Sequence, residues 1–246
     1  MKILGIDIGG TGIKGAPVDT DTGVMMGERF RIPTPEGGKP KAVSEVVGEV
    51  ARHFEWSGLI GCGFPAAVRG GTVLNAANLS KKWIGSNAAG LFSEQTNCTV
   101  HVLNDADAAG LAEMTFGAGR GRKGVVLIIT IGTGLGTSLF TDGVLLPNVE
   151  MGHIEMGGKD AETQASEAAR VRNELNWPEW TSVFNRYLQA MEHLLWPDLI
   201  ILGGGAIKKQ DKFFSQLKVG TEIVPAQFLN EAGIIGAALG AHLRMT

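Results

Sequence analysis

The pattern of apolar and polar residues at the start of the chain predicts a small antiparallel sheet followed by a helix. Residues 2–9 (KILGIDIG), 12–20 and 25–34 each have the composition of a strand, and Gly and Asp mark the turns between them. We therefore expect an antiparallel meander. Over residues 41–54, valine and phenylalanine recur every three to four positions, which is the stripe of an amphipathic helix.

The rest of the chain alternates apolar strands with helices. Strands are predicted over residues 59–68, 99–104 and 197–205, and helices over residues 107–119, 161–175, 179–196 and 230–245. The last helix carries a face of alanine and glycine that suits close packing on another helix. At 246 residues the chain is long enough for one large α/β domain or for two lobes.

One structural plan occurs twice along the chain. Residues 4–19 (LGIDIGGTGIKGAPVD) contain an apolar strand, a tight turn rich in Gly and Thr, and a second strand ending in Asp, and residues 128–142 (IITIGTGLGTSLFTD) repeat that order. The aligned positions Asp7 and Thr130 lie half of the chain apart, as expected after an ancestral duplication, although short glycine turns also recur by chance. The predicted divisions are an N-terminal lobe over 1–104, a C-terminal lobe over 105–229 and a helix over 230–246 that packs back on the N-terminal lobe.

Composition and charge exclude several classes of protein. With 44% hydrophobic and 19% charged residues, the composition is that of an ordinary globular protein. The net charge of -3 gives no basic field for nucleic acid or an anionic membrane, so neither is an expected partner, and an anionic substrate must meet local charge. No apolar stretch reaches the roughly 18 residues of a membrane span, and the chain starts on a strand, so we expect a cytoplasmic protein. Cys62 and Cys98 lie among apolar or small residues, which favours buried, reduced thiols.

The glycine-rich turns suggest an anion site of an unusual kind. Dinucleotide and P-loop sites need a helix after the glycine loop, whereas here both loops are followed by strand-like residues, which excludes those two classes. A β-hairpin with exposed backbone N–H groups and the hydroxyls of Thr11 and Thr133 can instead form a concave anion site. A third segment, LGGGA at 202–206, follows a strand. Either loop alone could be merely a structural turn, but three together favour phosphate or nucleotide binding.

These segments carry a family resemblance. GIDIGGTGIKG, IGTGLGT and LGGGA resemble the phosphate-1, phosphate-2 and adenosine motifs of the actin-like, hexokinase-type ATPases. Within that superfamily the chain resembles the ROK sugar kinases, most closely their polyphosphate glucokinase branch, through RIPTP, WIG, LNDADAAGLAE, GAGRG, PNVEMGH, KKQDKF and NEAGIIGAALGA in order. The resemblance implies a two-lobed α/β fold of the actin-like (ribonuclease H-like) type, with a duplicated mixed sheet flanked by helices and an active-site cleft between the lobes. It also implies phosphorylation of the 6-hydroxyl of glucose.

The resemblance assigns roles to the residues of both lobes. In the first hairpin, Asp7 would orient Mg²⁺ through water. The other residues implied to bind the phosphoryl donor are Gly9, Gly10, Thr11, Lys14, Thr133, Gly134, Gly203, Gly204 and Gly205. The residues implied to bind the sugar are Asn78, Asn104, Asp105, Glu150, His153 and Glu162, with Asp105 as the general base.

The chain departs from the family at the zinc site. The glutamate aligned with Glu162 usually follows a cysteine cluster, which this chain lacks, so we expect no structural zinc. His153 then has no metal to bind, and it either contacts the sugar or is a structural histidine. Polyphosphate glucokinases also lack the cluster, so its absence favours that branch.

The segment LNDADAAG contains two carboxylates, which we expect to have different roles. Positions two apart do not face each other in a helix, so Asp105 and Asp107 do not form an acid and base pair. Asp105, at the end of a strand beside Asn104, suits a base that deprotonates the attacking sugar hydroxyl. Asp107, in the first turn of the helix, is expected to cap free N–H groups there.

The identity of the phosphoryl donor is open between inorganic polyphosphate, ATP or both. Three basic clusters consist of Lys81 and Lys82, of Arg120, Arg122 and Lys123, and of Lys208, Lys209 and Lys212. Each alone is typical of a solvated surface, but together, if they border the cleft, they would form a track for polyphosphate. The second cluster, adjacent in sequence to the second hairpin, is the most suggestive.

Two other functions stay open. The chain could be a kinase that uses ATP to phosphorylate mannose, fructose or N-acetylmannosamine, or a sugar sensor without catalysis. ROK repressors carry an additional N-terminal helix-turn-helix, of which this chain shows no trace, and Asp7, Lys14 and Asp105 favour turnover. The expected partners are a sugar and polyphosphate or a nucleotide, and the expected oligomer is a homodimer, with a monomer as the alternative.

Overall fold

The computed structural model describes residues 1–76 and 79–244, which form two compact units. The first unit is Met1–Ala112 with the C-terminal segment from Glu231, and the second is Glu113–Asn230. The division falls within helix α3 (Asp105–Phe116), eight residues after the predicted boundary at 104.

The first unit contains a mixed sheet with helices on both faces. The strands of the first unit are β1 (Lys2–Ile8), β2 (Ile13–Asp19), β3 (Val24–Met25), β4 (Phe30–Ile32), β5 (Ile60–Phe64), β6 (Val68–Arg69), β7 (Thr72–Val73) and β8 (Val100–Asn104). Its helices are α1 (Pro40–His53), α2 (Ala88–Thr96), the start of α3, α7 (Ala232–His242) and the 3-10 helices η1 (Glu36–Gly38) and η2 (Lys81–Trp83). The strand order is β3-β2-β1-β5-β8, where β2 is antiparallel to β1, and β5 and β8 are parallel to it.

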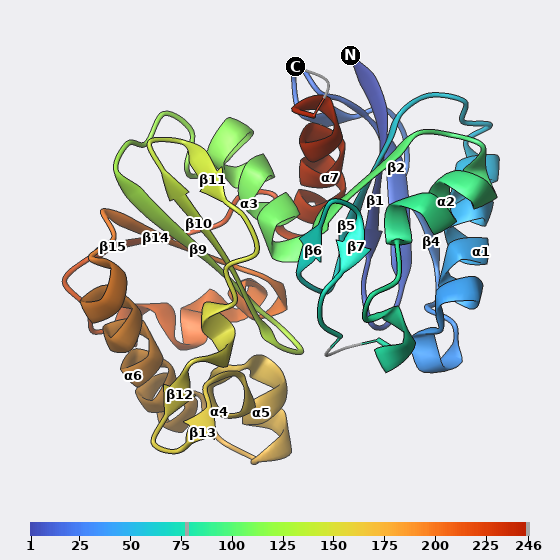
Figure 1. Ribbon diagram of the computed structural model, residues 1–246. Coiled ribbons are helices and arrows are strands. Elements are labelled where there is room, and N and C mark those ends of the chain that lie inside the picture. The colour runs from blue at the N-terminus through green and yellow to red at the C-terminus, as the bar shows by residue number, and fades with distance from the viewer. Residues whose placement is uncertain (77–78, 245–246) are drawn as a thin grey trace. The chain divides into compact units, whose positions relative to one another are not determined.

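The two faces of this sheet pack differently. Alternate residues of β1, namely Leu4, Ile6 and Ile8, are fully buried against the valine stripe of α1. Helix α7 covers the opposite face (Figure 1) and contacts β1, β5 and β8. Glycines allow this close approach, because a Cβ at Gly5 or Gly61 would overlap the backbone of α7.

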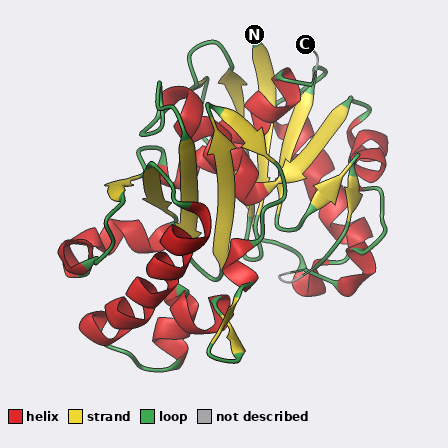
Figure 2. Cartoon of the chain, turned by 60° about the vertical axis from the view of Figure 1, so that its left-hand side comes forward, coloured by secondary structure: helices red, strands yellow, loops and turns green. Residues whose placement is uncertain are grey.

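The second unit repeats the plan of the first. Its strands are β9 (Val125–Ile131), β10 (Leu135–Thr141), β11 (Val144–Leu146), β12 (Glu155–Met156), β13 (Lys159–Asp160), β14 (Leu199–Gly203) and β15 (Glu222–Pro225). Its helices are the end of α3, α4 (Glu162–Ala165), α5 (Glu167–Arg172), α6 (Trp177–Leu195) and the 3-10 helices η3 (Met151–His153), η4 (Gly205–Lys212), η5 (Phe214–Gln216) and η6 (Leu229–Glu231), the last of which ends in the first unit. The order β11-β10-β9-β14-β15 has the same strand directions as the first sheet, and α6 lies along one face (Figures 1 and 2). The predicted duplicated mixed sheet is therefore confirmed.

Several predicted elements differ from the structure. Residues 25–34 form no continuous strand: β3 and β4 pair separately with β2, and exposed Gly27, Glu28 and Arg29 lie between them. The strand predicted over 59–68 ends at Phe64 because Pro65 has no N–H to continue the ladder. Helix α2 was not predicted, since its sequence, AAGLFSEQT, has no clear apolar stripe.

Two helix predictions were also wrong in detail. The helix predicted over 161–175 is split into α4 and α5 at Ser166, whose hydroxyl accepts a hydrogen bond from the N–H of Ala169 and starts a new helix. The helix predicted from 107 begins at Asp105.

Of the two thiols, Cys62 is buried, which raises its pKa, but Cys98 is only half-buried. In the described part of the chain no helix is both apolar enough and long enough to cross a membrane.

Candidate active site

The backbone of the first hairpin turn is fixed by hydrogen bonds, two of which come from residues elsewhere in its unit. The Gly9 N–H donates to the Gly12 carbonyl at 3.0 Å, which closes the turn and leaves Gly10 and Thr11 exposed. The Arg31 guanidinium donates to the Thr11 carbonyl at 3.0 Å, and the Thr34 hydroxyl donates to the Gly9 carbonyl. The bonds from Arg31 and Thr34 use carbonyl groups, so these two side chains fix the turn without occupying its N–H groups, as an anion site requires.

Asp7 and Lys14 form a cross-strand ion pair next to this turn. They are direct partners in the β1–β2 ladder, and Lys14 Nζ lies 2.9 Å from Asp7 Oδ2. Both side chains are mostly buried. Gly233, in the first turn of α7, faces the pair, because a Cβ there would lie 2.8 Å from Asp7 Cγ. A carboxylate, an ammonium group and the glycine turn predicted to bind phosphate therefore meet at one end of β1.

Asp105 lies at the same edge of the sheet as Asp7. Strands β1, β5 and β8 are parallel, so their carboxyl ends meet at one edge, where ligands of open α/β sheets bind. Two strand spacings separate β1 from β8, which is roughly 10 Å. Asn104 fixes the corner that carries Asp105: its Oδ1 accepts the Asp107 N–H at 2.9 Å and its Nδ2 donates to the Ala66 carbonyl at 3.2 Å.

Asn104 has a capping role at the start of α3 that was not predicted, and the cap expected at Asp107 stays a prediction. Asn104 Oδ1 accepts the N–H of the residue three positions on, which is the geometry of an N-cap. Asp107 is 1% exposed, so its carboxylate lies inside the first unit. Asp105 is half-buried, and its Oδ1 accepts the Ala106 N–H at 2.8 Å. The two aspartates thus have different environments, as predicted, and Asp105 is the more accessible.

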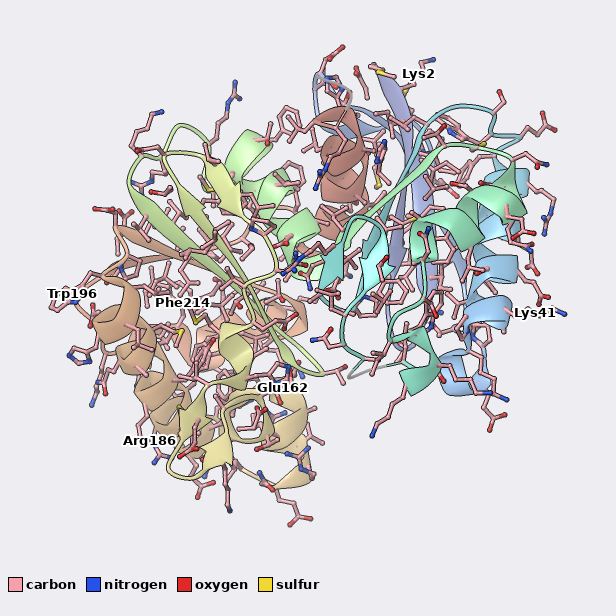
Figure 3. All side chains as sticks on the ribbon, viewed as in Figure 1. Lys2, Lys41, Glu162, Arg186, Trp196 and Phe214 are labelled. Carbon is pink, nitrogen blue, oxygen red and sulfur yellow. The ribbon has the colours of Figure 1, made fainter. Side chains whose placement is uncertain are left out.

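In the second unit, Glu162 lies against the second glycine turn. The Gly132 N–H donates to the Gly134 carbonyl at 3.0 Å, whereas the corresponding bond of the first hairpin joins residues three positions apart, and Thr133 is exposed. Glu162 Oε2 accepts the Leu135 N–H at 2.9 Å and lies where a side chain of residue 134 would be. Figure 3 labels Glu162 at the start of α4, near the end of this hairpin. A residue predicted to bind sugar thus contacts the hairpin predicted to bind phosphate.

The segment VEMGH is held next to the same hairpin. The Thr137 hydroxyl donates to the Val149 carbonyl at 2.7 Å and accepts the Met151 N–H at 3.0 Å, which fixes the backbone on both sides of Glu150. Gly152 is required here, because a Cβ would overlap the Leu135 carbonyl. His153 Nε2 lies 3.9 Å from Glu150 Oε2. Three predicted sugar residues, Glu150, His153 and Glu162, therefore gather around the start of β10.

A residue that was not predicted, Asp160, joins this group. Asp160 Oδ2 lies 2.8 Å from His153 Nδ1. Burial lowers the pKa of His153, but the hydrogen bond to Asp160 and the charges of Glu162, Asp160 and Glu150 outweigh it, so that the pKa is raised above 6.5. The signal that could have revealed Asp160 is the Gly-Gly pair in EMGGKD, which predicts a hairpin folding back toward His153.

The LGGGA segment lies at the same edge as the second glycine turn. Strands β9 and β14 are parallel with Gly203 opposite Thr130, so Gly203, Gly204 and Gly205 begin where the hairpin turns. Gly204 has a φ of 82°, and a Cβ there would overlap the backbone of Ile131. The loop therefore approaches the hairpin as closely as backbone can.

The position of the second basic cluster in the sequence suggested that it lies beside the second hairpin turn. In the structure it does not lie there. Arg120, Arg122 and Lys123 precede β9, whereas the turn follows it, and the seven residues of β9 separate the two by about 20 Å. Arg122 pairs with Glu222 at the start of β15, which belongs to that far edge. The short distance along the sequence was misleading because the two ends of a strand lie at opposite edges of the sheet.

The other basic clusters have different surroundings. Lys208, Lys209 and Lys212 lie in η4, which follows β14 at the same edge as the turn. Lys209 Nζ is 3.6 Å from Glu167 Oε1, and Lys212 Nζ is 3.6 Å from Asp211 Oδ2. Lys81 and Lys82 are exposed in η2 of the first unit.

The predicted residues thus form one group in each unit. Asp7, Gly9, Gly10, Thr11, Lys14, Asn104 and Asp105 lie at one edge of the first sheet, and Thr133, Gly134, Glu150, His153, Glu162 and Gly203 to Gly205 lie around one edge of the second. Asn78 lies outside the described residues. Among residues 1–76 and 79–244, no group of three or more His, Cys, Asp or Glu side chains could hold a metal ion alone.

Comparison with known proteins places this geometry among sugar kinases. A model of the ROK family matches residues 3–170. Polyphosphate glucokinase of Mycobacterium tuberculosis is 45% identical over 239 residues, 97% of this chain and 90% of that protein. The crystal structure of inorganic polyphosphate/ATP-glucomannokinase from Arthrobacter sp. strain KM is 46% identical, covers 99% of both chains and superposes with a TM-score of 0.96. A ROK family glucokinase from Streptomyces griseus, solved with glucose and AMPPNP, shares the fold at 24% identity, with a TM-score of 0.79 over 99% of this chain and 100% of that one.

Proposed function

Because the chain belongs to the ROK family, we propose that it phosphorylates the 6-hydroxyl of glucose to glucose 6-phosphate, with inorganic polyphosphate, ATP or both as the phosphoryl donor. The observation that carries the proposal is near-full-length similarity to a polyphosphate glucokinase and to a polyphosphate/ATP-glucomannokinase. The predicted family and actin-like ATPase fold are confirmed by the same matches. The protein is thus a phosphotransferase with an alcohol acceptor.

Asp105 is the proposed general base. In this mechanism Asp105 takes the proton of the 6-hydroxyl while that oxygen forms a bond to the terminal phosphorus of the donor. The bond between that phosphorus and the bridging oxygen breaks, and the shortened donor leaves. Positioning of the reactants and neutralisation of charge dominate the catalysis of such reactions. The base has the smaller role of completing the deprotonation of the attacking hydroxyl. The position of Asp105 at a helix start and sheet edge, held by Asn104, supports this role.

The donor phosphates are proposed to bind the two glycine turns and Lys14. The turns supply N–H groups, Thr11 and Thr133 supply hydroxyls, and Lys14 supplies a positive charge. Asp7 is proposed to orient a Mg²⁺ ion through water, since Mg²⁺ usually keeps several waters beside a carboxylate and the phosphates, and the ion would neutralise charge on the donor. The sugar is proposed to bind Asn78, Asn104, Glu150, His153 and Glu162.

A donor assay tests the proposal directly. Glucose 6-phosphate formation is coupled to its dehydrogenase, with long-chain polyphosphate or ATP as the only donor and with Mg²⁺ present or chelated. We expect turnover with at least one donor, and loss of turnover when Mg²⁺ is removed. If neither donor supports turnover on glucose, the proposed function is wrong.

A second sugar is the runner-up substrate. The Arthrobacter relative is named a glucomannokinase, so mannose is the first alternative to test, followed by fructose and N-acetylmannosamine. A panel of these sugars at equal concentration ranks them by kcat/KM. The sensor alternative predicts sugar binding without turnover for every sugar in the panel.

The third basic cluster is the proposed part of a polyphosphate track. The triple variant K208A/K209A/K212A should raise the KM for polyphosphate roughly 5-fold or more at low salt, with a smaller effect at high salt and on ATP, because the attraction of a long polyanion is screened by salt. The matched control is R120A/R122A/K123A, which removes the same charge from the far edge of the same sheet. Equal effects of both triple variants, or equal losses with ATP and polyphosphate, would refute the track.

Compartment and assembly are proposed more coarsely. Two free cysteines fit the reducing cytoplasm, which also supplies ATP. A homodimer is the proposed assembly, and light scattering at assay concentrations distinguishes it from a monomer.

A further inference from the structure

One carboxylate connects two of the residues proposed to bind sugar. Asp160 Oδ2 bonds His153 Nδ1 at 2.8 Å, and Asp160 Oδ1 accepts the Glu162 N–H at 2.9 Å. The Glu162 carboxylate in turn accepts the Leu135 N–H at the second glycine turn. Each carboxylate oxygen of Asp160 therefore makes a hydrogen bond, one with His153 and the other with the backbone of Glu162.

The sequence builds this arrangement with a short hairpin. Gly157 and Gly158 have φ values of 60° and 78°, which suit the two central positions of a tight hairpin turn. The turn pairs Glu155 with Asp160, and the Ala161 N–H donates to the Ile154 carbonyl at 2.9 Å. Residue 160 is thereby returned to the side of His153, although seven positions separate the two along the chain.

We propose that Asp160 is a positioning residue of the sugar site, which holds the His153 ring with Nδ1 toward itself and Nε2 toward the sugar, and which fixes the start of the helix carrying Glu162. This inference rests on the proposed function. Asp160 itself touches no reacting atom in this scheme, since its two oxygens are bonded to the protein.

The pairing determines what His153 can offer to a hydroxyl. When the imidazole is neutral, its proton lies on Nδ1 and is donated to Asp160, so Nε2 accepts a hydrogen bond from the sugar. When it is protonated, Nε2 becomes a donor and is 3.9 Å from the Glu150 carboxylate. The charged groups facing the ring are Asp160, Glu150 and Glu162, which together raise its pKa against the opposing effect of burial.

The sign of the pH effect follows from this raised pKa. The interaction of protonated His153 with its acidic neighbours stabilises the fold fully below the ordinary pKa of 6.5 and is lost as the pH rises through the higher pKa of the folded state. Removal of the Asp160 charge should therefore move the His153 titration to lower pH.

The test variant is Asp160→Asn, which keeps the shape but has one oxygen for two donors. We expect the KM for glucose to rise roughly 10-fold while kcat and the donor KM stay within about 2-fold, because a charge-assisted hydrogen bond is lost outside the reacting centre. The inflection of the glucose KM against pH should shift to lower pH. Asp160→Glu, which restores the charge, should recover part of the loss.

The matched control is Glu155→Gln, which removes a carboxylate from the partner position of the same hairpin. It should leave the glucose KM unchanged. Thermal melting of all variants checks that they fold. In the His153→Gln background, Asp160→Asn should raise the glucose KM by less than it does alone, because part of its effect passes through His153.

A readout that needs no turnover separates this inference from the proposed function. The pKa of His153 is measured by NMR titration in the wild type, Asp160→Asn and Glu155→Gln, and its signal is assigned with His153→Gln among the five histidines. A lower pKa in Asp160→Asn alone supports the pairing even if glucose is not the substrate. If the pKa and the glucose KM of Asp160→Asn match those of Glu155→Gln, the inference is overturned.

Discussion

Replacing Asp105 with asparagine should lower kcat for glucose phosphorylation by about 10²- to 10⁴-fold while glucose binding is largely kept. The amide has nearly the same shape and still accepts hydrogen bonds, but it cannot take the proton of the 6-hydroxyl. The corner that holds the residue should survive, because Asn104 caps α3 with its own side chain. The measurement is kcat from the coupled assay together with glucose affinity from calorimetry.

Asp107→Asn is the matched control for this prediction. It makes the same chemical change two positions away, in a side chain that is 1% exposed, whereas that of Asp105 is half-buried. We expect it to lower the free energy of unfolding by about 1 kcal/mol, through loss of a charge at the helix start, and to leave kcat within a few-fold. If Asp105→Asn retains activity within a few-fold, the assignment of the base is wrong.

The features that could be predicted from the sequence are those built by neighbours in the chain. A strand, a glycine turn and a second strand form one hairpin, so both glycine turns could be placed from local patterns. The cross-strand pair of Asp7 and Lys14 follows from the register of the first hairpin. The corner at Asn104 and Asp105 is also local, because a buried strand passes directly into a helix.

The features that could not be predicted depend on which residues the strands and turns bring together in space. Asp160 reaches His153 only through the turn at Gly157 and Gly158, so the Gly-Gly pair was the one signal of its role in the sequence, and it was missed. The Arg120 cluster is adjacent to the second glycine hairpin in the sequence but lies a full strand length from its turn. The break at Ser166 was missed because a helix-capping hydroxyl within a helical pattern gives only a weak signal.

The second prediction concerns the contact between α7 and α3 in the first unit. Gly236→Ala should lower the free energy of unfolding by about 3 kcal/mol, since a Cβ at this position would overlap the Ala108 carbonyl and force the two helix backbones apart. Alanine is favoured over glycine in a helix by about 1 kcal/mol, so the packing term must overcome this gain. For a chain of this size the melting temperature should fall by roughly 10 °C.

The matched control for this contact is Gly240→Ala in the same helix. The nearest atom to its Cβ would be Leu103 Cδ1 at 2.7 Å, the end of a flexible side chain that can rotate away, so helix propensity should offset the cost to within about 1 kcal/mol. Gly233, one turn before Gly236, faces Asp7, so displacement of α7 by Gly236→Ala should also weaken binding of the phosphoryl donor. Differential scanning calorimetry measures the first effect and the donor KM the second. Equal melting temperatures for the two variants would mean that α7 can move away from α3 without cost, and the close glycine contact would then have no role in holding Asp7.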